Sequence, residues 1–227
     1  MTWSVMIFAA GFGTRMKHLT QDRPKPLVEV NGTPLIDHAL ALANDLPAQH
    51  IVANLHYKPE ALAQHLSDRG VETILEDPEI LDTGGGLRNA LPVLGENPVI
   101  TLNSDAIWCG ANPLTELVAA WNPAKMDGLL MCIPKPLAAG YNGPGNFVRS
   151  ADGRIVRGPG LIYGGAQIIK TDLLYTISEN AFSLNTLWDI MIDKNSLYAL
   201  EYGSDWCDVG HPEGVDLAEK LLARRHV

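Results

Sequence analysis

The feature that most constrains this chain is an apolar segment, residues 3–9, that runs directly into a glycine-rich turn, Gly11-Phe12-Gly13. A turn of this kind after the first strand of an α/β fold lets backbone N–H groups approach an anionic ligand. Further apolar stretches lie at 50–55, 71–75 and 98–102. Three helical patterns lie between these stretches: one begins near Pro34, one covers 59–66 and one ends near Leu91. Continuous apolar strands that alternate with helices predict a Rossmann-like α/β fold, with a mostly parallel sheet covered by helices on both faces.

The pattern changes from about Met126 onward. Strands are predicted at 126–133, 161–169 and 197–202, and helices at 185–193 and 212–224. Residues 134–160 are rich in glycine and proline and contain a hairpin-like turn at 150–153. A length of 227 residues gives room for one sizeable α/β domain. We therefore predict a single domain, 1–227, made of two halves, 1–125 and 126–227.

Charge and composition limit the class of ligand and the compartment. The formal net charge is −9 and the cationic residues are sparse, whereas proteins that follow a nucleic-acid backbone are basic at least locally. We expect a small-molecule ligand, no nucleic acid and no membrane, because no apolar run is long enough to span a bilayer. The N-terminus has no basic region typical of a signal peptide. Three scattered cysteines without a CxxC pair favour a reducing, cytoplasmic compartment and no zinc site.

The glycine turn does not match two common phosphate-binding motifs. The dinucleotide fingerprint requires a third glycine where Met16 stands, which argues against a nicotinamide-dependent oxidoreductase. A Walker A loop requires Gly-Lys-Ser/Thr, and this chain has Thr14-Arg15 instead. What remains is a glycine loop that ends in an arginine and is followed ten residues later by Lys25 between two prolines. Arginine offers phosphate a two-pronged fork and lysine a compact charge, although an ordinary strand-to-helix turn with surface cations is the alternative.

Six sequence motifs stand out along the chain: Gly11-Phe12-Gly13-Thr14-Arg15-Met16, Pro24-Lys25-Pro26-Leu27-Val28, Val30-Asn31-Gly32-Thr33-Pro34-Leu35-Ile36, Leu81-Asp82-Thr83-Gly84-Gly85-Gly86, Asn103-Ser104-Asp105 and Trp206-Cys207-Asp208-Val209-Gly210. Together they resemble the sugar nucleotidyltransferase family, which includes glucose-1-phosphate thymidylyltransferases and mannose-1-phosphate guanylyltransferases. The resemblance spans nearly the whole chain. It implies a nucleotide-binding half, 1–125, and a sugar-binding half, 126–227.

Two aspartates are the candidate metal ligands. Asp105 follows an apolar strand, and α/β sheets bind ligands at the carboxyl ends of their strands. Asp208 comes from a distant loop, and two such carboxylates suit Mg²⁺, which fills its shell with water and substrate phosphates. A loop-capping role is the alternative for either residue. The resemblance implies that both hold the catalytic Mg²⁺, the expected cofactor.

The resemblance also implies the remaining roles in catalysis and nucleotide binding. Arg15 and Lys25 are expected to act in catalysis beside the two aspartates. The residues expected to bind the nucleotide are Ala9, Ala10, Gly11, Gly13, Thr14, Asp82, Thr83 and Gly86. Glu76 and Asp77, just before the second loop, would suit the N–H groups of guanine, but solvated turn residues before Pro78 are the interpretation we favour.

The sugar side departs from the family pattern. A Glu-Lys-Pro segment in many relatives corresponds here to Val156-Arg157-Gly158-Pro159, which disfavours glucose and mannose substrates. We expect Asn146, Arg157 and Gly165 to contact the sugar, and Arg149 or Arg157 to pair with a carboxylate on it, although a surface role for Arg157 is the alternative.

Within the family, the compact length and the Thr-Gly-Gly-Gly and Trp-Cys-Asp-Val-Gly runs are most similar to uridylyltransferases that act on N-acetylmuramate α-1-phosphate. The expected partners are therefore a nucleoside triphosphate, UTP favoured, and a sugar 1-phosphate. Guanylyl or thymidylyl transfer, or a non-catalytic nucleotide sensor of the same fold, are the alternatives. We expect no C-terminal β-helix and a monomer or small homo-oligomer.

Overall fold

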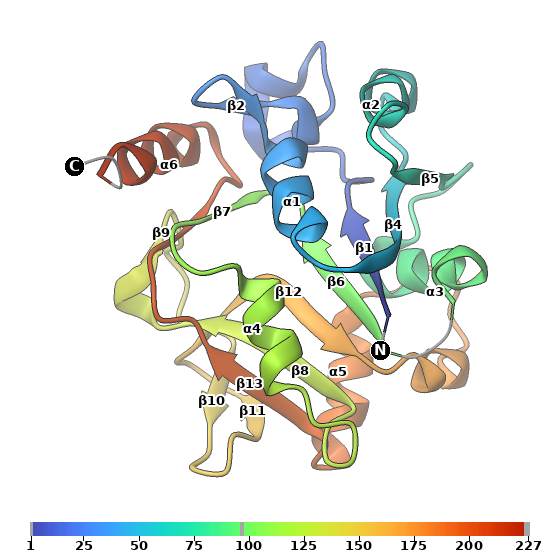
Figure 1. The fold of residues 1–227 in the computed structure, drawn as a ribbon, viewed down its shortest axis with the longest axis vertical. Coiled ribbons are helices and arrows are strands. Elements are labelled where there is room, and N and C mark those ends of the chain that lie inside the picture. Colours follow the sequence, from blue (N-terminus) through green and yellow to red (C-terminus); the bar gives the residue numbers. More distant parts are fainter. Residues whose placement is uncertain (1, 96–97, 225–227) are drawn as a thin grey trace.

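A seven-stranded sheet crosses both halves of the chain in the computed structural model, which describes residues 2–95 and 98–224 (Figure 1). The strands, in the order they take across the sheet, are β13 (Leu197–Glu201), β8 (Gly128–Ile133), β12 (Ile162–Ile169), β6 (Val99–Asn103), β1 (Trp3–Phe8), β4 (Ala48–Leu55) and β5 (Glu72–Leu75). Strand β12 runs antiparallel to β6 and β8, and the other neighbouring pairs are parallel. The predicted mostly parallel, mixed sheet is confirmed.

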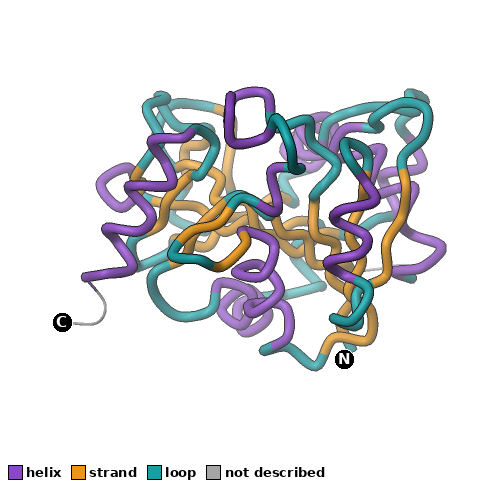
Figure 2. The backbone as a smooth tube through the Cα atoms, turned by 90° about the horizontal axis from the view of Figure 1, so that it is seen from above, coloured by secondary structure: helices purple, strands orange, loops and turns teal. Residues whose placement is uncertain are grey.

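Helices cover the sheet on both faces (Figure 2). One face carries α1 (Leu35–Asn44), α2 (Pro59–Leu66) and α4 (Pro113–Ala120), and the other carries α3 (Asp82–Leu94) and α5 (Leu184–Asp193). The alternation of side chains along β1 explains the two layers, because Val5 and Ile7 join the core under α1 and α2 while Met6 joins the core under α3. Burial on both faces accounts for the continuous apolar strands in the sequence.

Smaller elements surround the central sheet. A three-stranded sheet has the order β7 (Ala106–Trp108), β14 (Trp206–Asp208) and β9 (Ala138–Ala139), and α6 (Pro212–Ala223) packs beside it. Strands β10 (Phe147–Arg149) and β11 (Ile155–Arg157) form the expected hairpin, and β2 (Glu29–Val30) pairs with β3 (Thr33–Pro34). The described residues also form short 3₁₀ helices: η1 (Thr14–Thr20), η2 (Lys25–Leu27), η3 (Lys135–Leu137) and η4 (Asp172–Thr176).

Three local details of the structure differ from the expectations drawn from the sequence or add to them. Helix α4 was not expected, although Asn112 caps it by accepting from Leu114 N and Pro113 occupies its first turn, which are both helix-start signals. Asp208 belongs to strand β14, where it faces Ala106, and not to a loop. The Gly84-Gly85-Gly86 run lies inside α3 and is buried.

Close packing explains why the first position of this run is glycine. A Cβ atom on Gly84 would lie 2.5 Å from Phe182 Cδ2 and 2.9 Å from Phe182 O. We expect Gly84→Ala to lower the free energy of unfolding by about 1–3 kcal/mol, the usual cost of overpacking, as measured by urea denaturation. Gly203→Ala is the control, because nothing lies within 4 Å of its added Cβ, and it should change stability by less than about 0.5 kcal/mol. Equal stability of the two variants would contradict this account of the run.

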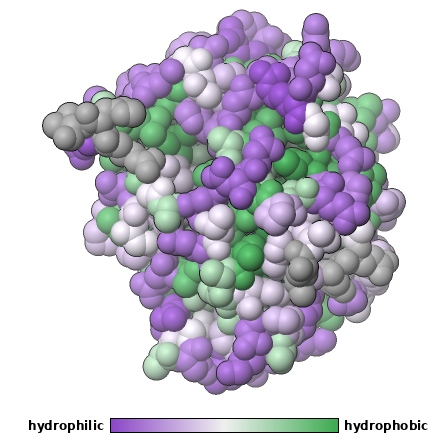
Figure 3. Space-filling view, viewed as in Figure 1, coloured by the Kyte–Doolittle hydropathy of each residue, from purple (hydrophilic) through white to green (hydrophobic). Residues whose placement is uncertain are grey.

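Hydrophilic side chains dominate the edge of the face seen in Figure 3, and hydrophobic ones show through in its middle. None of the helices in the described ranges combines the length and apolar character needed to cross a bilayer.

Candidate functional site

Two adjoining cavities open at the carboxyl ends of the central strands. The first has a volume of about 220 Å³ and the second about 360 Å³. Both are lined by Phe8, Asp82, Thr83, Asn103 and Asp105. Asp105 lies in the two-residue turn between β6 and β7, so the carboxylate predicted from its place after an apolar strand stands where the two cavities meet.

The glycine loop after β1 forms one wall of the first cavity. Ala9, Ala10 and Gly11 line it, and nothing lies within 4 Å of the position a Gly11 Cβ would take. Gly13 lies behind the wall with φ +64°, and a Cβ there would come within 2.9 Å of Lys25 Cβ. Glycine at position 13 therefore permits both the left-handed backbone and the close approach of Lys25. Thr14 begins η1, and neither Gly13 nor Thr14 is among the described residues that line either cavity.

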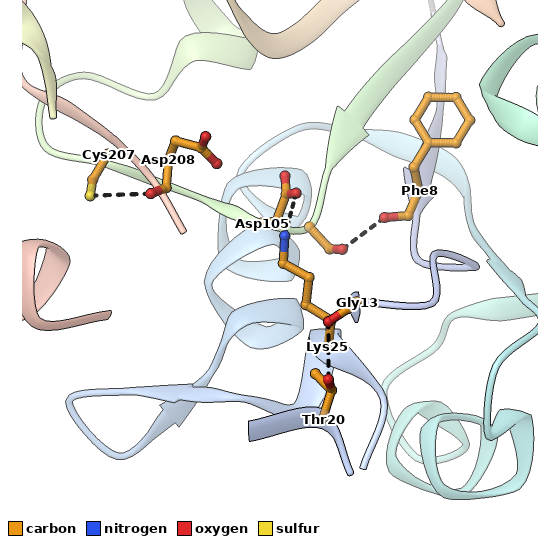
Figure 4. Close-up of polar contacts among 8 residues, drawn as sticks. Phe8, Gly13, Thr20, Lys25, Asp105, Cys207 and Asp208 are labelled. Atoms are coloured by element: carbon orange, nitrogen blue, oxygen red, sulfur yellow. Dashed lines mark hydrogen bonds and ion pairs between the residues drawn. The ribbon is translucent and has the colours of Figure 1, made fainter. Parts of the chain in front are cut away.

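Lys25 and Asp105 form an ion pair at the junction. Lys25 Nζ lies 2.7 Å from Asp105 Oδ2, and their side chains are 12% and 29% exposed (Figure 4). Burial disfavours the charged form of Asp105, but the Lys25 ammonium, its hydrogen bond and Arg15 outweigh this and hold the pKa of Asp105 below its usual value. Arg15 lines the second cavity. Lys25 and Asp105, which are 80 residues apart in the sequence, are thus brought together.

Asp208 lies next to Asp105 because β14 pairs with β7. Its backbone faces Ala106, and Val209 N donates to Asp105 O at 2.9 Å. Burial and the charge of Asp105 raise the pKa of Asp208, and the lowering effect of Lys25 and Arg15 offsets this rise only partly. Two carboxylates with opposite pKa shifts therefore share the wall of the second cavity.

The start of α3 separates the cavities. Asp82 and Thr83 line both, and Asp82 Oδ1 accepts from Thr83 N at 2.6 Å. Gly86, which we expected at the nucleotide, is instead buried behind the wall. A Cβ at this position would lie 2.5 Å from Glu76 Oε1, so glycine here makes room for a carboxylate.

Glu76 is not the solvated turn residue that the sequence favoured. Its side chain lines the first cavity, and the residue is only 2% exposed. Glu76 Oε1 accepts from Asn54 Nδ2 and Glu76 Oε2 accepts from Leu81 N, both at 2.7 Å. Asp77 is exposed, as expected for a turn. Sequence reasoning missed Asn54, whose only signal is a polar residue near the end of an apolar strand.

The second cavity brings together residues from the later half of the chain. Asn146, Gly165, Trp188 and Trp206 line it, and Asn146 Oδ1 accepts from Tyr163 N at 2.9 Å. Tyr141, Ser183, Leu184 and Asn185 complete this wall without having been predicted as sugar contacts.

Two predicted cationic contacts are not brought to this cavity. Arg157 Nε lies 2.8 Å from Asp189 Oδ1, and its guanidinium stacks on Phe147 and Trp188. Arg149 Nε donates to Ala199 O and its guanidinium pairs with Glu201. Of the described residues lining the second cavity, Arg15 is the single lysine or arginine. Arg149 and Arg157 therefore pair with the protein's own carboxylates and are not among the described residues that line the second cavity.

Comparison with known proteins places this arrangement in a family. Residues 5–139 match the MobA-like NTP transferase domain. The N-acetylmuramate alpha-1-phosphate uridylyltransferase of Caulobacter vibrioides is 36% identical over 96% of both chains. A mannose-1-phosphate guanyltransferase of Pichia angusta is 28% identical, and this match covers 92% of the present chain and 61% of that protein.

A solved structure supports the same fold. HddC from Yersinia pseudotuberculosis, complexed with GMP-PN, superposes with a TM-score of 0.77 at 22% identity, covering 97% of this chain and 100% of that one. The match to the domain family covers more than half of the chain, and the uridylyltransferase match covers nearly all of it. The chain therefore belongs to the MobA-like NTP transferase family and is a nucleotidyltransferase enzyme.

Proposed function

We propose that this enzyme transfers the uridylyl group of UTP to N-acetylmuramate 1-phosphate in a Mg²⁺-dependent reaction, giving the UDP-sugar and pyrophosphate. The observation that carries the reaction is the pair of cavities that meet at Asp105 with Lys25 and Arg15 beside it. Such an arrangement suits transfer of a group between two anionic ligands. The choice of substrates rests on the 36% identity to the N-acetylmuramate alpha-1-phosphate uridylyltransferase over 96% of both chains.

The chemistry requires positioning and charge neutralisation. An oxygen of the sugar phosphate attacks the α-phosphorus of the nucleotide, a new P–O bond forms, and the bond to the β-phosphate oxygen breaks as pyrophosphate leaves. The attacking phosphate is already anionic near neutral pH, so no strong general base is required. Lys25 and Arg15 stabilise the negative charge that gathers on the phosphates, and the cavity walls align the reactants.

The two aspartates fit a magnesium ion. Mg²⁺ binds through one or two carboxylates and completes its octahedron with water and substrate phosphates. Asp105 is held ionised by its cationic neighbours, whereas the Asp105 charge helps to raise the pKa of Asp208. A cation held between the two carboxylates would relieve this repulsion. When bound, Mg²⁺ would supply charge neutralisation and orientation of the phosphates.

The second cavity is our candidate for the sugar site. It is the larger of the two, and the loop from Gly140 to Gly145 that precedes Asn146 contains small residues that leave room for a bulky lactyl substituent. Because Arg149 and Arg157 are engaged elsewhere, we assign the sugar contacts to Asn146, Gly165 and the aromatic side chain of Trp188.

Guanylyl transfer is one alternative that the sequence leaves open, because an acidic pair would suit guanine. Asp77 is exposed and is not part of the described cavity wall, and both oxygens of Glu76 already accept hydrogen bonds inside the protein. Each oxygen of Glu76 keeps a second lone pair that can accept from guanine, so the choice of uracil rests on the identity to the uridylyltransferase.

We expect UTP with N-acetylmuramate 1-phosphate to give the highest kcat/KM in a matrix of four nucleoside triphosphates and several sugar 1-phosphates, read as pyrophosphate release. A higher value for GTP with mannose 1-phosphate would establish the guanylyltransferase alternative. If UTP is preferred but glucose 1-phosphate performs equally well, the base assignment stands and the argument from room in the second cavity is wrong.

A further inference from the structure

Three hydrogen bonds, which we call the Asn54–Glu76 relay, link the ends of β1, β4 and β5 beneath the first cavity. Ala9 N, after β1, donates to Asn54 Oδ1 at 2.8 Å. Asn54 Nδ2, on β4, donates to Glu76 Oε1 at 2.7 Å, and Leu81 N donates to Glu76 Oε2 at 2.7 Å. Asn54 is 4% exposed and Glu76 is 2% exposed, so water competes little for these groups.

The backbone N–H groups at the two ends of this relay fix which group donates and which accepts in each of its hydrogen bonds. Ala9 N and Leu81 N are backbone donors and cannot accept, so each must face an oxygen. Asn54 therefore turns its oxygen to Ala9 and its amide nitrogen to Glu76, and the carboxylate is the side chain that can accept from both Asn54 and Leu81. The backbone of Glu76 is also held, since Glu76 N donates to Leu55 O and His56 Nδ1 lies 2.8 Å from Glu76 O.

We propose that Asn54 and Glu76 are positioning residues that set the spacing between the two walls of the nucleotide cavity. Ala9 begins the glycine loop, and Leu81 directly precedes Asp82 and Thr83, which line both cavities. The relay holds one wall against the other across Asn54 and Glu76, and Gly86 is glycine because a Cβ there would displace Glu76 Oε1. The inference rests on the proposed function, because it takes the first cavity to be the nucleotide site.

A different role for Glu76 would be direct reading of the base by its negative charge. The two roles predict opposite outcomes when the charge is moved. If the two residues only position the walls, nucleotide binding depends on each donor having an acceptor, and the negative charge can sit at position 54 or at position 76. In direct reading, the carboxylate at position 76 is itself required.

Each single substitution breaks the pattern. In Glu76→Gln, one oxygen must serve both Asn54 Nδ2 and Leu81 N, so one buried donor loses its acceptor. In Asn54→Asp, two carboxylates face each other where the present atoms lie 2.7 Å apart. We expect each variant to raise KM for the nucleotide at least about tenfold, with a smaller change in kcat and none in KM for the sugar phosphate, because the relay shapes one binding wall.

Moving the negative charge from position 76 to position 54 restores the pattern of hydrogen-bond donors and acceptors. In the double variant N54D/E76Q, the carboxylate at position 54 accepts from Ala9 N and from the new amide at position 76, whose oxygen accepts from Leu81 N. Every backbone donor again has an acceptor, with the same net charge and nearly the same volume. We expect the double variant to recover KM for the nucleotide to within about threefold of wild type, which gives a large coupling in the double-mutant cycle.

Acid should rescue one of the single variants. A proton shared between the facing carboxylates of Asn54→Asp would remove their repulsion, so KM relative to wild type should fall between pH 8 and pH 6. Glu76→Gln should show no such trend. A merely structural role would lower the melting temperature without giving this pH profile or the separation of KM from kcat.

Glu72→Gln is the matched control. Glu72 lies on β5 and pairs with His50 on β4 at 2.7 Å, so it joins the same two strands, but its side chain is 52% exposed. We expect its kinetics to equal those of wild type.

UTP binding measured by calorimetry, alongside turnover, separates a failure of the proposed function from a failure of the relay. An inactive wild type would refute the proposed function, while the UTP affinities of the variants would still report on the relay.

Three results would overturn the relay. Single variants with wild-type affinity for the nucleotide would show that the spacing does not depend on it. A double variant as impaired as the worse single variant would show that position 76 requires its charge. A changed order of preference among UTP, GTP and CTP in Glu76→Gln, without loss of overall rate, would establish direct base reading instead.

Discussion

Asp105→Asn and Asp208→Asn are each expected to abolish measurable pyrophosphate release while the protein stays folded. Asparagine keeps the shape of each side chain but removes the charge that would hold a cation at the junction of the cavities. The loss should also follow chelation, since excess EDTA should stop the wild-type reaction and added Mg²⁺ should restore it. Circular dichroism and the melting temperature check that the variants remain folded.

Asp127→Asn serves as the control for this pair of variants. Asp127 pairs with Lys170 at 2.9 Å with side-chain exposure of 28%, close to that of Asp105, but it directly precedes β8 and so lies at the amino ends of the strands, opposite the cavities. It should retain full activity. Turnover that persists in excess chelator, or in either site variant, would remove the metal from the proposed mechanism.

Lys25→Ala is expected to lower kcat/KM by at least about a hundredfold. The ammonium is poised at the junction, and preorganised charges that face developing negative charge typically contribute about 3 kcal/mol. The variant also leaves the half-buried Asp105 without its nearest cation, so the pKa of that carboxyl should rise toward its ordinary value or above it. Kinetics with saturating and limiting UTP would separate the loss in kcat from the loss in KM.

Lys170→Ala tests whether the effect is specific to the site, because it removes the lysine of a comparable ion pair remote from the cavities. We expect it to retain wild-type kcat/KM. Near-full activity in Lys25→Ala would exclude Lys25 from the reaction, and an equal loss in Lys170→Ala would mean that the loss reflects general destabilisation.

Local pattern accounts for much of the fold. The strands at 3–9 and 161–169 and the helix at 59–66 were placed within a residue of β1, β12 and α2, because an apolar run or a helical period is a property of consecutive residues. The start signal of α4, a capping asparagine followed by proline, was also local and was overlooked.

The sequence by itself also determined the charged centre. Lys25 between prolines, the aspartate after an apolar strand and the Asp-Val-Gly run near the end stood out as motifs, and the fold brings Lys25 to 2.7 Å from Asp105 and pairs Asp208 beside it. These residues could be found in advance because their neighbours in sequence mark them, even though their contacts are with distant segments.

Only the tertiary structure decided how the remaining polar side chains are used. Glu76 sits in a Glu-Asp-Pro stretch that looks like an exposed turn, yet Asn54, 22 residues earlier, and Leu81 N hold it buried. Arg157 looked available to a sugar, yet Asp189, 32 residues later, engages it. Whether a polar group is buried and paired depends on partner residues that are distant in the sequence and close in the fold. The free energy of each pairing depends on the geometry of the contact, which no local sequence pattern encodes.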